Sequence, residues 1–258
     1  VKGFFLELIS SAFLGFIQGL TEFLPISSSG HVELFSNIFD LSKPSITFDI
    51  VVHFASLLAI LLFFKFNYSE SIENDYEINA NKKIIALSFI PIGVIGLFFR
   101  DFLNNESREL SAIGVSFIFS GIIICLHFLK KFNLSFLKII IIASLFQSFA
   151  ALPGISRSGM IIGISVFLGL SLKRSIIVSF LMSIPLILIS SFYEIITLFL
   201  NGVSQLDLFY LLTAFALSFF ASFIGIKIMI FLSTFIQLRI FGVYNIILGL
   251  LILLFSMF

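Results

Sequence analysis

Long apolar segments constrain this chain more than any other feature of its sequence. Six of them approach the length of about 20 residues that an α-helix needs to cross the hydrocarbon core of a membrane. A water-soluble fold could not cover so much apolar surface, because 59% of the 258 residues are hydrophobic and 11% are charged, against about 25% charged in a typical soluble domain. We therefore expect an all-α, polytopic integral membrane protein with about six full spans. The predicted spans are Ile46 to Phe66, Ile84 to Phe99, Leu110 to Leu129, Ser175 to Leu200, Leu206 to Leu232 and Ile236 to Phe258.

Two further apolar segments are interrupted by clusters of Pro, Gly and Ser. Residues 4–24 run into the stretch from Pro25 to His31, and residues 136–152 run into the stretch from Pro153 to Gly159. Backbone that is not helical survives at membrane depth only where protein buries it or where it lines a wet cavity. Both segments are therefore predicted to be broken or re-entrant helices.

The two interrupted segments resemble each other. Gln18 to Gly30 and Gln147 to Gly159 share a Gln, then Leu-Pro, then Ile-Ser-x-Ser-Gly, with one extra residue after the second Pro. We interpret this likeness as an internal repeat within one domain of residues 1–258, with pseudo-repeats of roughly residues 1–129 and 130–258.

Lysines and arginines in short loops predict the orientation of the two pseudo-repeats, since cytoplasmic loops carry an excess of both. Two loops are rich in Lys, while the loop between them has only Arg100 and Arg108. If both Lys-rich loops are cytoplasmic, the repeats are inverted, which places a polar site between them near the membrane midplane. The lysines are Lys65, Lys82 and Lys83 in one loop and Lys130, Lys131 and Lys138 in the other.

Polar and charged side chains within the interrupted segments are the candidate functional residues. An ionised group at the membrane centre costs about 2.5–3.5 kcal/mol, so such groups usually serve a function. In the first segment Gln18 and Glu22 are four residues apart and share a helix face, and Gly30 and His31 follow shortly after. Three residues with hydroxyl groups lie between Glu22 and Gly30, namely Ser27, Ser28 and Ser29. A carboxylate, hydroxyls and an imidazole thus converge on one short stretch.

The second cluster holds Arg157 between Ser156 and Ser158, shortly after Gly154. A guanidinium group matches the oxygens of a phosphate and keeps its charge, so it needs an anion beside it. Backbone N–H groups at the helix breaks could add donors for a phosphate. An ion pair between Arg157 and Glu22 that braces the two breaks is the structural alternative, and it is compatible with a site that also takes phosphate.

Asp49 and His53 share a helix face at the start of the next span. The sequence leaves open whether they lie beside the polar site or a metal, or simply at the membrane interface. The chain has 15 Lys and Arg against 14 Asp and Glu, so it has no basic field that would attract nucleic acid.

The two clusters, Gln18 to His31 and Leu152 to Gly159, closely resemble the motifs of the bacterial undecaprenyl-diphosphate phosphatase family associated with bacitracin resistance. Length and span pattern agree over essentially the whole chain. The resemblance implies hydrolysis of undecaprenyl diphosphate to undecaprenyl phosphate and inorganic phosphate, which recycles the lipid carrier of peptidoglycan synthesis. It also implies a multi-pass protein of the bacterial inner (plasma) membrane and a divalent cation, usually Mg²⁺.

Carried over by residue, the resemblance assigns catalysis to Glu22, Ser28, His31 and Arg157, and metal binding to Glu22. The resemblance and the motifs around these residues assign substrate binding to Gln18, Ser27, Ser29, Gly30, Gly154, Ser156 and Ser158. One position departs from the family, which often has Glu where this chain has Gln18. Either Glu22 suffices with Asp49 or substrate oxygens, or the position needs only a polar ligand.

The expected mechanism is in-line displacement at the terminal phosphorus, with Ser28 as the preferred nucleophile and water as the alternative. His31 or Glu22 would accept the proton, while Arg157 and a metal would neutralise charge. Membrane lipids are expected partners, and a second copy of the chain is a candidate partner.

Two other functions fit part of the pattern. A lipid transporter or flippase also builds a polar site between inverted halves, but it has little use for His31 beside Ser28 and Glu22. Another superfamily of lipid phosphatases requires a second His soon after its Ser-Arg motif, and residues 158–173 contain none.

Overall fold

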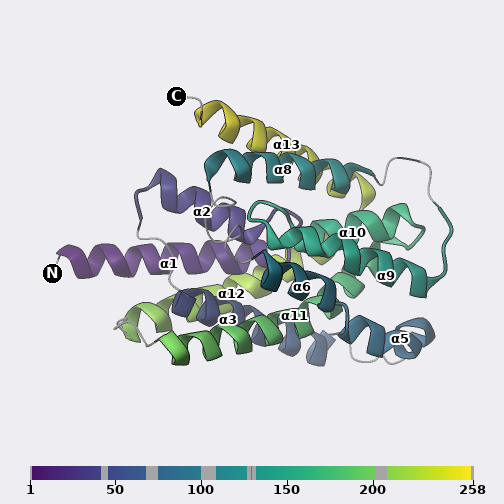
Figure 1. The fold of residues 1–258 in the computed structure, drawn as a ribbon, viewed down its shortest axis with the longest axis horizontal. Coiled ribbons are helices and arrows are strands. Elements are labelled where there is room, and N and C mark those ends of the chain that lie inside the picture. Colours follow the sequence, from purple (N-terminus) through teal and green to yellow (C-terminus); the bar gives the residue numbers. More distant parts are fainter. Residues whose placement is uncertain are drawn as a thin grey trace.

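The computed structural model describes residues 2–41, 46–67, 75–99, 109–126, 129, 132–201 and 208–256. These residues form α-helices and one 3-10 helix and contain no strand (Figure 1). The all-α class predicted from the sequence is therefore confirmed. In chain order the helices are α1 (Lys2–Glu22), α2 (Ser28–Ile38), α3 (Ile46–Asn67), α5 (Tyr76–Ala86), α6 (Ile90–Phe98), α8 (Leu110–Cys125), α9 (Phe136–Gln147), η3 (Ser148–Ala151), α10 (Arg157–Phe167), α11 (Leu172–Asn201), α12 (Leu208–Phe231) and α13 (Phe235–Phe255).

Within the described ranges, five segments are long and apolar enough to cross a membrane. They are Thr47–Asn67, Tyr76–Phe98, Leu172–Tyr193, Leu208–Phe231 and Gln237–Phe255. The helix predicted from Leu110 has 16 residues, which at 1.5 Å per residue is about 24 Å, short of the roughly 30 Å core of a bilayer. Five full spans plus shorter apolar helices thus replace the six full spans expected, and the protein is a multi-pass membrane protein.

The span predicted from Ile84 to Phe99 lies almost entirely within the span Tyr76–Phe98, but it is not one continuous helix. The chain breaks at residues 87–89, between α5 and α6, and Pro91 lies in the first turn of α6. Proline has no N–H to donate and fits best at the start of a helix, which explains why a helix begins here and does not continue through. The carbonyl of Ser88 accepts a hydrogen bond from the Gln147 side chain, so α9 supports this break.

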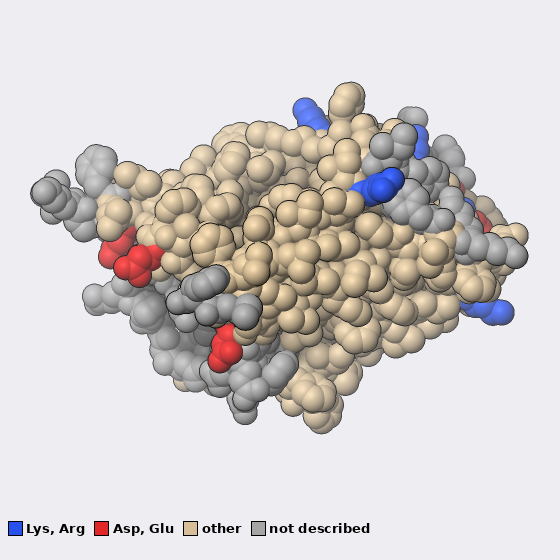
Figure 2. All heavy atoms as spheres, turned by 90° about the horizontal axis from the view of Figure 1, so that it is seen from above, with Lys and Arg blue, Asp and Glu red and all other residues tan. Residues whose placement is uncertain are grey.

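Charge is unevenly distributed along the molecule. On the face shown in Figure 2, Lys and Arg lie in the right half, while Asp and Glu lie mostly in the left half. Arg174 at the start of α11 forms ion pairs with Asp75, the N-cap of α5, and with Glu77 of α5, at 2.8 and 2.7 Å. These ion pairs join the start of α11 to the start of α5. Which end faces the cytoplasm stays a prediction. Lys130, Lys131, Arg100 and Arg108 lie outside the described residues.

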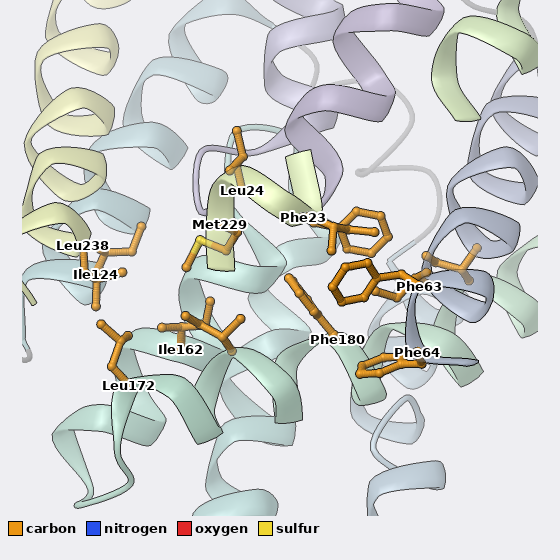
Figure 3. Close-up of a cluster of buried hydrophobic side chains, with 14 of the residues drawn as sticks. Phe23, Leu24, Phe63, Phe64, Ile124, Ile162, Leu172, Phe180, Met229 and Leu238 are labelled. Atoms are coloured by element: carbon orange, nitrogen blue, oxygen red, sulfur yellow. The ribbon is translucent and has the colours of Figure 1, made fainter. Parts of the chain in front are cut away.

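A buried apolar cluster holds the break after α1 in place (Figure 3). Phe23, the first residue after α1, is 1% exposed and meets Phe180 of α11 edge to face, with ring centroids 5.4 Å apart. Leu24 packs into the same cluster, together with side chains of α3, α10 and α12. Because lipid tails are as apolar as these side chains, van der Waals packing is what favours this arrangement in a membrane.

Both interrupted segments are broken helices, as predicted. α1 ends at Glu22 and α2 begins at Ser28, while α9 and η3 are followed by α10 from Arg157. In Figure 1 the α1–α2 unit lies on the left and the α9–α10 unit on the right, and their breaks meet in the middle. Gly30 is central to this contact, since a Cβ there would lie 2.7 Å from the Cα of Gly154. The boundary between pseudo-repeats near residue 129 stays a prediction.

Candidate active site

Two serines in corresponding positions of the repeat start the two inner helices. Ser27 is the N-cap of α2 and accepts a hydrogen bond from the Gly30 N–H at 3.3 Å. Ser156 is the N-cap of α10 and accepts one from the Gly159 N–H at 3.0 Å. A serine in this position satisfies a backbone donor that the helix leaves unpaired. The residue that follows each cap, Ser28 or Arg157, therefore opens its helix at the meeting point of the breaks.

Glu22 lies at this meeting point and accepts hydrogen bonds from three side chains. Its Oε1 accepts from an Arg157 Nη2 at 2.7 Å, and its Oε2 accepts from the Ser28 hydroxyl at 2.7 Å and the Gln18 amide at 2.7 Å. The Glu22 side chain is 5% exposed and that of Arg157 13%. Three donors, one of which is a cation, favour the ionised carboxylate. The ion pair considered from sequence is thus present, and it joins the two pseudo-repeats.

The predicted substrate-binding serines of the second motif bond within the protein. Ser158 donates to the Leu24 carbonyl at 2.8 Å, and the Ser156 N–H donates to the Ser120 hydroxyl at 3.0 Å. Ser156 and Ser158 are both buried, so their visible role is to hold one break against the other. Ser29, in contrast, is exposed beside Ser28.

His31 is buried and uses both ring nitrogens away from Ser28. Nδ1 lies 2.7 Å from the Ser27 carbonyl oxygen, and Nε2 lies 2.7 Å from the Tyr244 hydroxyl. The Ser28 proton is directed instead to Glu22. Of the two proton acceptors expected from sequence, the geometry favours Glu22.

His53 joins the site through Gln18. Its Nδ1 lies 2.8 Å from the Asp49 carbonyl oxygen, and its Nε2 lies 3.2 Å from the Gln18 amide nitrogen and 3.9 Å from Glu22 Oε2. Since a carbonyl oxygen only accepts, Nδ1 carries the hydrogen and Nε2 accepts from the amide. The open question about His53 is answered in favour of the site, whereas the contact of Asp49 described here is through its backbone.

Tyr244, Asn245 and Ser120 contact the breaks or a ring of the site but were not predicted from the sequence. Asn245 is fully buried in α13 and donates to the Pro25 carbonyl at 3.0 Å. A Tyr-Asn pair inside an otherwise apolar span was the available signal, because a polar group at membrane depth usually has a partner. Ser120 lacked even this signal, since Ser is common in transmembrane helices.

The donors present allow only a modest metal site. Among the described residues, no group of three or more His, Cys, Asp and Glu side chains could hold an ion together. Mg²⁺ is commonly held by one or two carboxylates plus the phosphates of its substrate. Glu22 meets this minimum, because Oε2 already accepts two hydrogen bonds while Oε1 accepts one and keeps a second lone pair.

Comparisons with known proteins agree with this geometry. The family model of bacitracin resistance protein BacA matches residues 11–251, which include both breaks. An undecaprenyl-diphosphatase of Methanococcus maripaludis is 36% identical over 241 residues, covering 90% of this chain and 93% of the relative. That of Halothermothrix orenii is 30% identical over 253 residues (96% and 98%), and undecaprenyl-diphosphatase 1 of Shouchella clausii is 31% identical over 269 residues (97% and 97%). The chain therefore belongs to the bacitracin resistance protein BacA family.

Proposed function

We propose that this protein hydrolyses undecaprenyl diphosphate to undecaprenyl phosphate and inorganic phosphate. The observation that carries the proposal is the convergence of Ser28 and Arg157, one from each helix break, on the buried carboxylate of Glu22. A nucleophile bonded to its base, with a cation alongside, is the arrangement that phosphoryl transfer needs. The shared name of the relatives supports this reaction and gives no support to a transporter.

In the first step Ser28 Oγ attacks the terminal phosphorus. The Oγ–P bond forms as the bridging P–O bond breaks, undecaprenyl phosphate leaves, and Glu22 Oε2 takes the hydroxyl proton that it already accepts at 2.7 Å. In the second step Glu22 first releases this proton to solvent, and it then takes a proton from a water whose oxygen attacks the phosphoserine phosphorus. The P–Oγ bond breaks, inorganic phosphate leaves, and Glu22 Oε2 returns its proton to Ser28 Oγ. Direct attack by water with the same base is the alternative.

Arg157 supplies the positive charge for the transferred phosphoryl group. One of its N–H groups is used by Glu22, and the fork of a guanidinium leaves further donors for phosphate oxygens. The N-termini of α2 and α10 lie at the same point, and the N-terminus of a helix favours an anion.

We further propose that a divalent cation, with Mg²⁺ as the first candidate, is held by Glu22 and the substrate phosphates. When bound, such an ion would neutralise charge on the transferred group. The protein would act in the inner membrane, surrounded by lipids, and return the lipid carrier to cell-wall synthesis. Bacitracin resistance would follow because the protein supplies undecaprenyl phosphate. A homodimer stays a prediction.

The test is phosphate release from a polyprenyl diphosphate by purified protein in detergent, with Mg²⁺ or with a chelator. We expect release with Mg²⁺, loss with the chelator, and a loss of about 100-fold or more in Glu22→Ala and Arg157→Ala. Arg239→Ala is the matched control, since Arg239 is exposed at the start of α13.

The nucleophile is tested separately. A phosphoserine at Ser28 trapped during turnover supports covalent catalysis, whereas full activity in Ser28→Ala contradicts it. Retained binding of the lipid by wild-type protein without any release of phosphate would contradict the hydrolase and favour transport.

A further inference from the structure

The break before α2 contains a residue in an uncommon backbone conformation. Ser27 has φ +67° and ψ 102°, a region that residues with a Cβ rarely adopt. Such a conformation persists only where the surrounding contacts hold it. Ser27 directly precedes Ser28, whose hydroxyl donates to Glu22. Whatever holds Ser27 therefore also sets the direction of the proposed nucleophile.

His31 makes two contacts with Ser27. Its backbone N–H donates to the Ser27 carbonyl at 3.3 Å, and its ring Nδ1 lies 2.7 Å from the same oxygen. A carbonyl oxygen has no hydrogen to give, so Nδ1 must be the donor. In a neutral imidazole the other nitrogen, Nε2, is then an acceptor.

Tyr244 of α13 provides the donor for that acceptor. Its hydroxyl lies 2.7 Å from Nε2, and its ring is nearly parallel to the imidazole, with 6° between the planes and 5.8 Å between centroids. His31 itself is 4% exposed. The ring is thus fixed in position by one partner on each nitrogen.

The next residue of α13 contacts the same break at a second point. Asn245 donates to the Pro25 carbonyl at 3.0 Å and is fully buried. One turn of α13 therefore holds the break directly at Pro25 and, through His31, at Ser27.

From this geometry we propose that Tyr244 is a positioning residue that acts through His31. Its hydroxyl fixes the imidazole as the neutral tautomer with the hydrogen on Nδ1, which holds Ser27 in its conformation and aims Ser28 at Glu22. His31 then does not accept the Ser28 proton, because that proton already has Glu22 as its acceptor. The kinetic part of this proposal rests on the proposed phosphatase activity.

The kinetic test compares variants that keep or remove one hydrogen bond. Tyr244→Phe is expected to lower kcat about tenfold, the effect of one hydrogen bond of ordinary strength, with KM within about twofold. Tyr193→Phe is the matched control, since Tyr193 of α11 and Tyr244 are both 41% exposed, and it should leave kcat unchanged.

His31→Asn separates positioning from proton transfer. An Asn amide can donate from near the place of Nδ1, so His31→Asn should keep at least tenfold more activity than His31→Ala, and adding Tyr244→Phe to it should change little. If His31 were the base, His31→Asn and His31→Ala would lose activity to the same extent, by about 10²–10⁴-fold. Equal loss in both, or a Tyr244→Phe enzyme equal to wild type, would overturn the proposal.

A spectroscopic measurement reads the tautomer without any need for activity. In protein labelled with ¹⁵N at its three histidines, nitrogen shifts distinguish hydrogen on Nδ1, hydrogen on Nε2 and the charged ring, and His31→Asn identifies the His31 signals. We expect hydrogen on Nδ1 in the wild type and a mixture of states in Tyr244→Phe. Hydrogen on Nε2 in the wild type would overturn the proposal. If the tautomer is the expected one but the protein releases no phosphate, the proposed function is refuted and the proposed role of Tyr244 in fixing the tautomer is not.

Discussion

Glu22 shows how single residues built the site and how far their sequence positions revealed it. Its partnership with Gln18 follows from helical spacing, and Glu22 was one of two expected acceptors of the Ser28 proton. The ion pair with Arg157 was considered from sequence only as a structural alternative. The contact between His31 and Tyr244 could not be predicted in the same way. It joins residues 213 positions apart, and a Tyr in an apolar span looks like an ordinary interfacial residue.

Replacing Arg157 by Lys tests whether charge alone suffices. Arg157→Lys keeps the cation beside Glu22 but loses the planar fork that serves carboxylate and phosphate together. We expect a fall in kcat/KM of about tenfold or more, the effect of one charge-assisted hydrogen bond, with little change in melting temperature. Steady-state phosphate release checks it, with Arg239→Lys as the control. Activity within twofold of wild type would show that the fork is not needed.

Replacing Gln18 by Met tests the link from His53 to Glu22. The Gln18 amide donates to Glu22 Oε2 and lies against His53 Nε2, so Gln18→Met removes a donor from two acceptors. We expect a loss of stability of about 1–3 kcal/mol, the effect of losing one hydrogen bond to a buried charged group, and reduced activity. His53→Ala should cost less activity, because Glu22 keeps its amide donor. The reverse order, measured on the same preparations, would give His53 a direct role in the reaction.

At the scale of elements, the broken helices were predictable where repeated sequence marked them. Pro25 and Pro153 lie in clusters with Ser and Gly that interrupt a helix. Such interruptions occur at membrane depth only where protein buries the backbone or where it lines a wet cavity. Pro91 and Pro185 each stand alone in an apolar run, yet α6 begins at the first and α11 continues through the second. The difference depends on the neighbouring helices, since the break near Pro91 receives the Gln147 side chain.

The contact between the two breaks requires a glycine. In Gly30→Ala the new Cβ would lie 2.7 Å from Gly154 Cα and 2.7 Å from the Phe117 ring, so the breaks must move apart. We expect a destabilisation of about 1–3 kcal/mol from overpacking and loss of most of the activity, because Ser28 and Arg157 would no longer reach one carboxylate.

Gly96→Ala in α6 is the matched control for this change. A Cβ at Gly96 meets nothing within 4 Å, and Ala is favoured over Gly in a helix by about 0.5–1 kcal/mol. Thermal unfolding in detergent and phosphate release should both be unharmed there. A Gly30→Ala protein as stable and active as Gly96→Ala would show that the breaks do not need their close contact.

At the scale of the whole molecule, composition and apolar segment length predicted the membrane bundle. The number of full spans was harder to predict, since α8 ends at Cys125 and is too short to count as one. The residue at which a helix ends depends on its contacts with neighbouring helices, and apolar composition alone does not predict those contacts. Charge segregation was predictable in outline, because the positive-inside rule acts on whole loops.

Labelling of introduced cysteines in intact cells tests the orientation. In a Cys125→Ala background, Lys83→Cys on α5 lies at the basic end, whereas Glu7→Cys near the start of α1 lies at the other. We expect a membrane-impermeant thiol reagent added outside to modify Glu7→Cys and to reach Lys83→Cys only after lysis. Labelling in the opposite pattern would reverse the proposed orientation.

The ion pair at the centre of the site also has a consequence for biosynthesis. Glu22 and Arg157 are 135 positions apart, so a ribosome makes the carboxylate long before its cation. Until Arg157 enters the membrane, Glu22 would be an uncompensated charge there. A chain that has inserted only its first half therefore holds an acid without its counter-ion, and under the proposed mechanism we expect it not to remove phosphate from a lipid. We then expect activity only once synthesis of the second half completes the pair, so that each active molecule has assembled both halves.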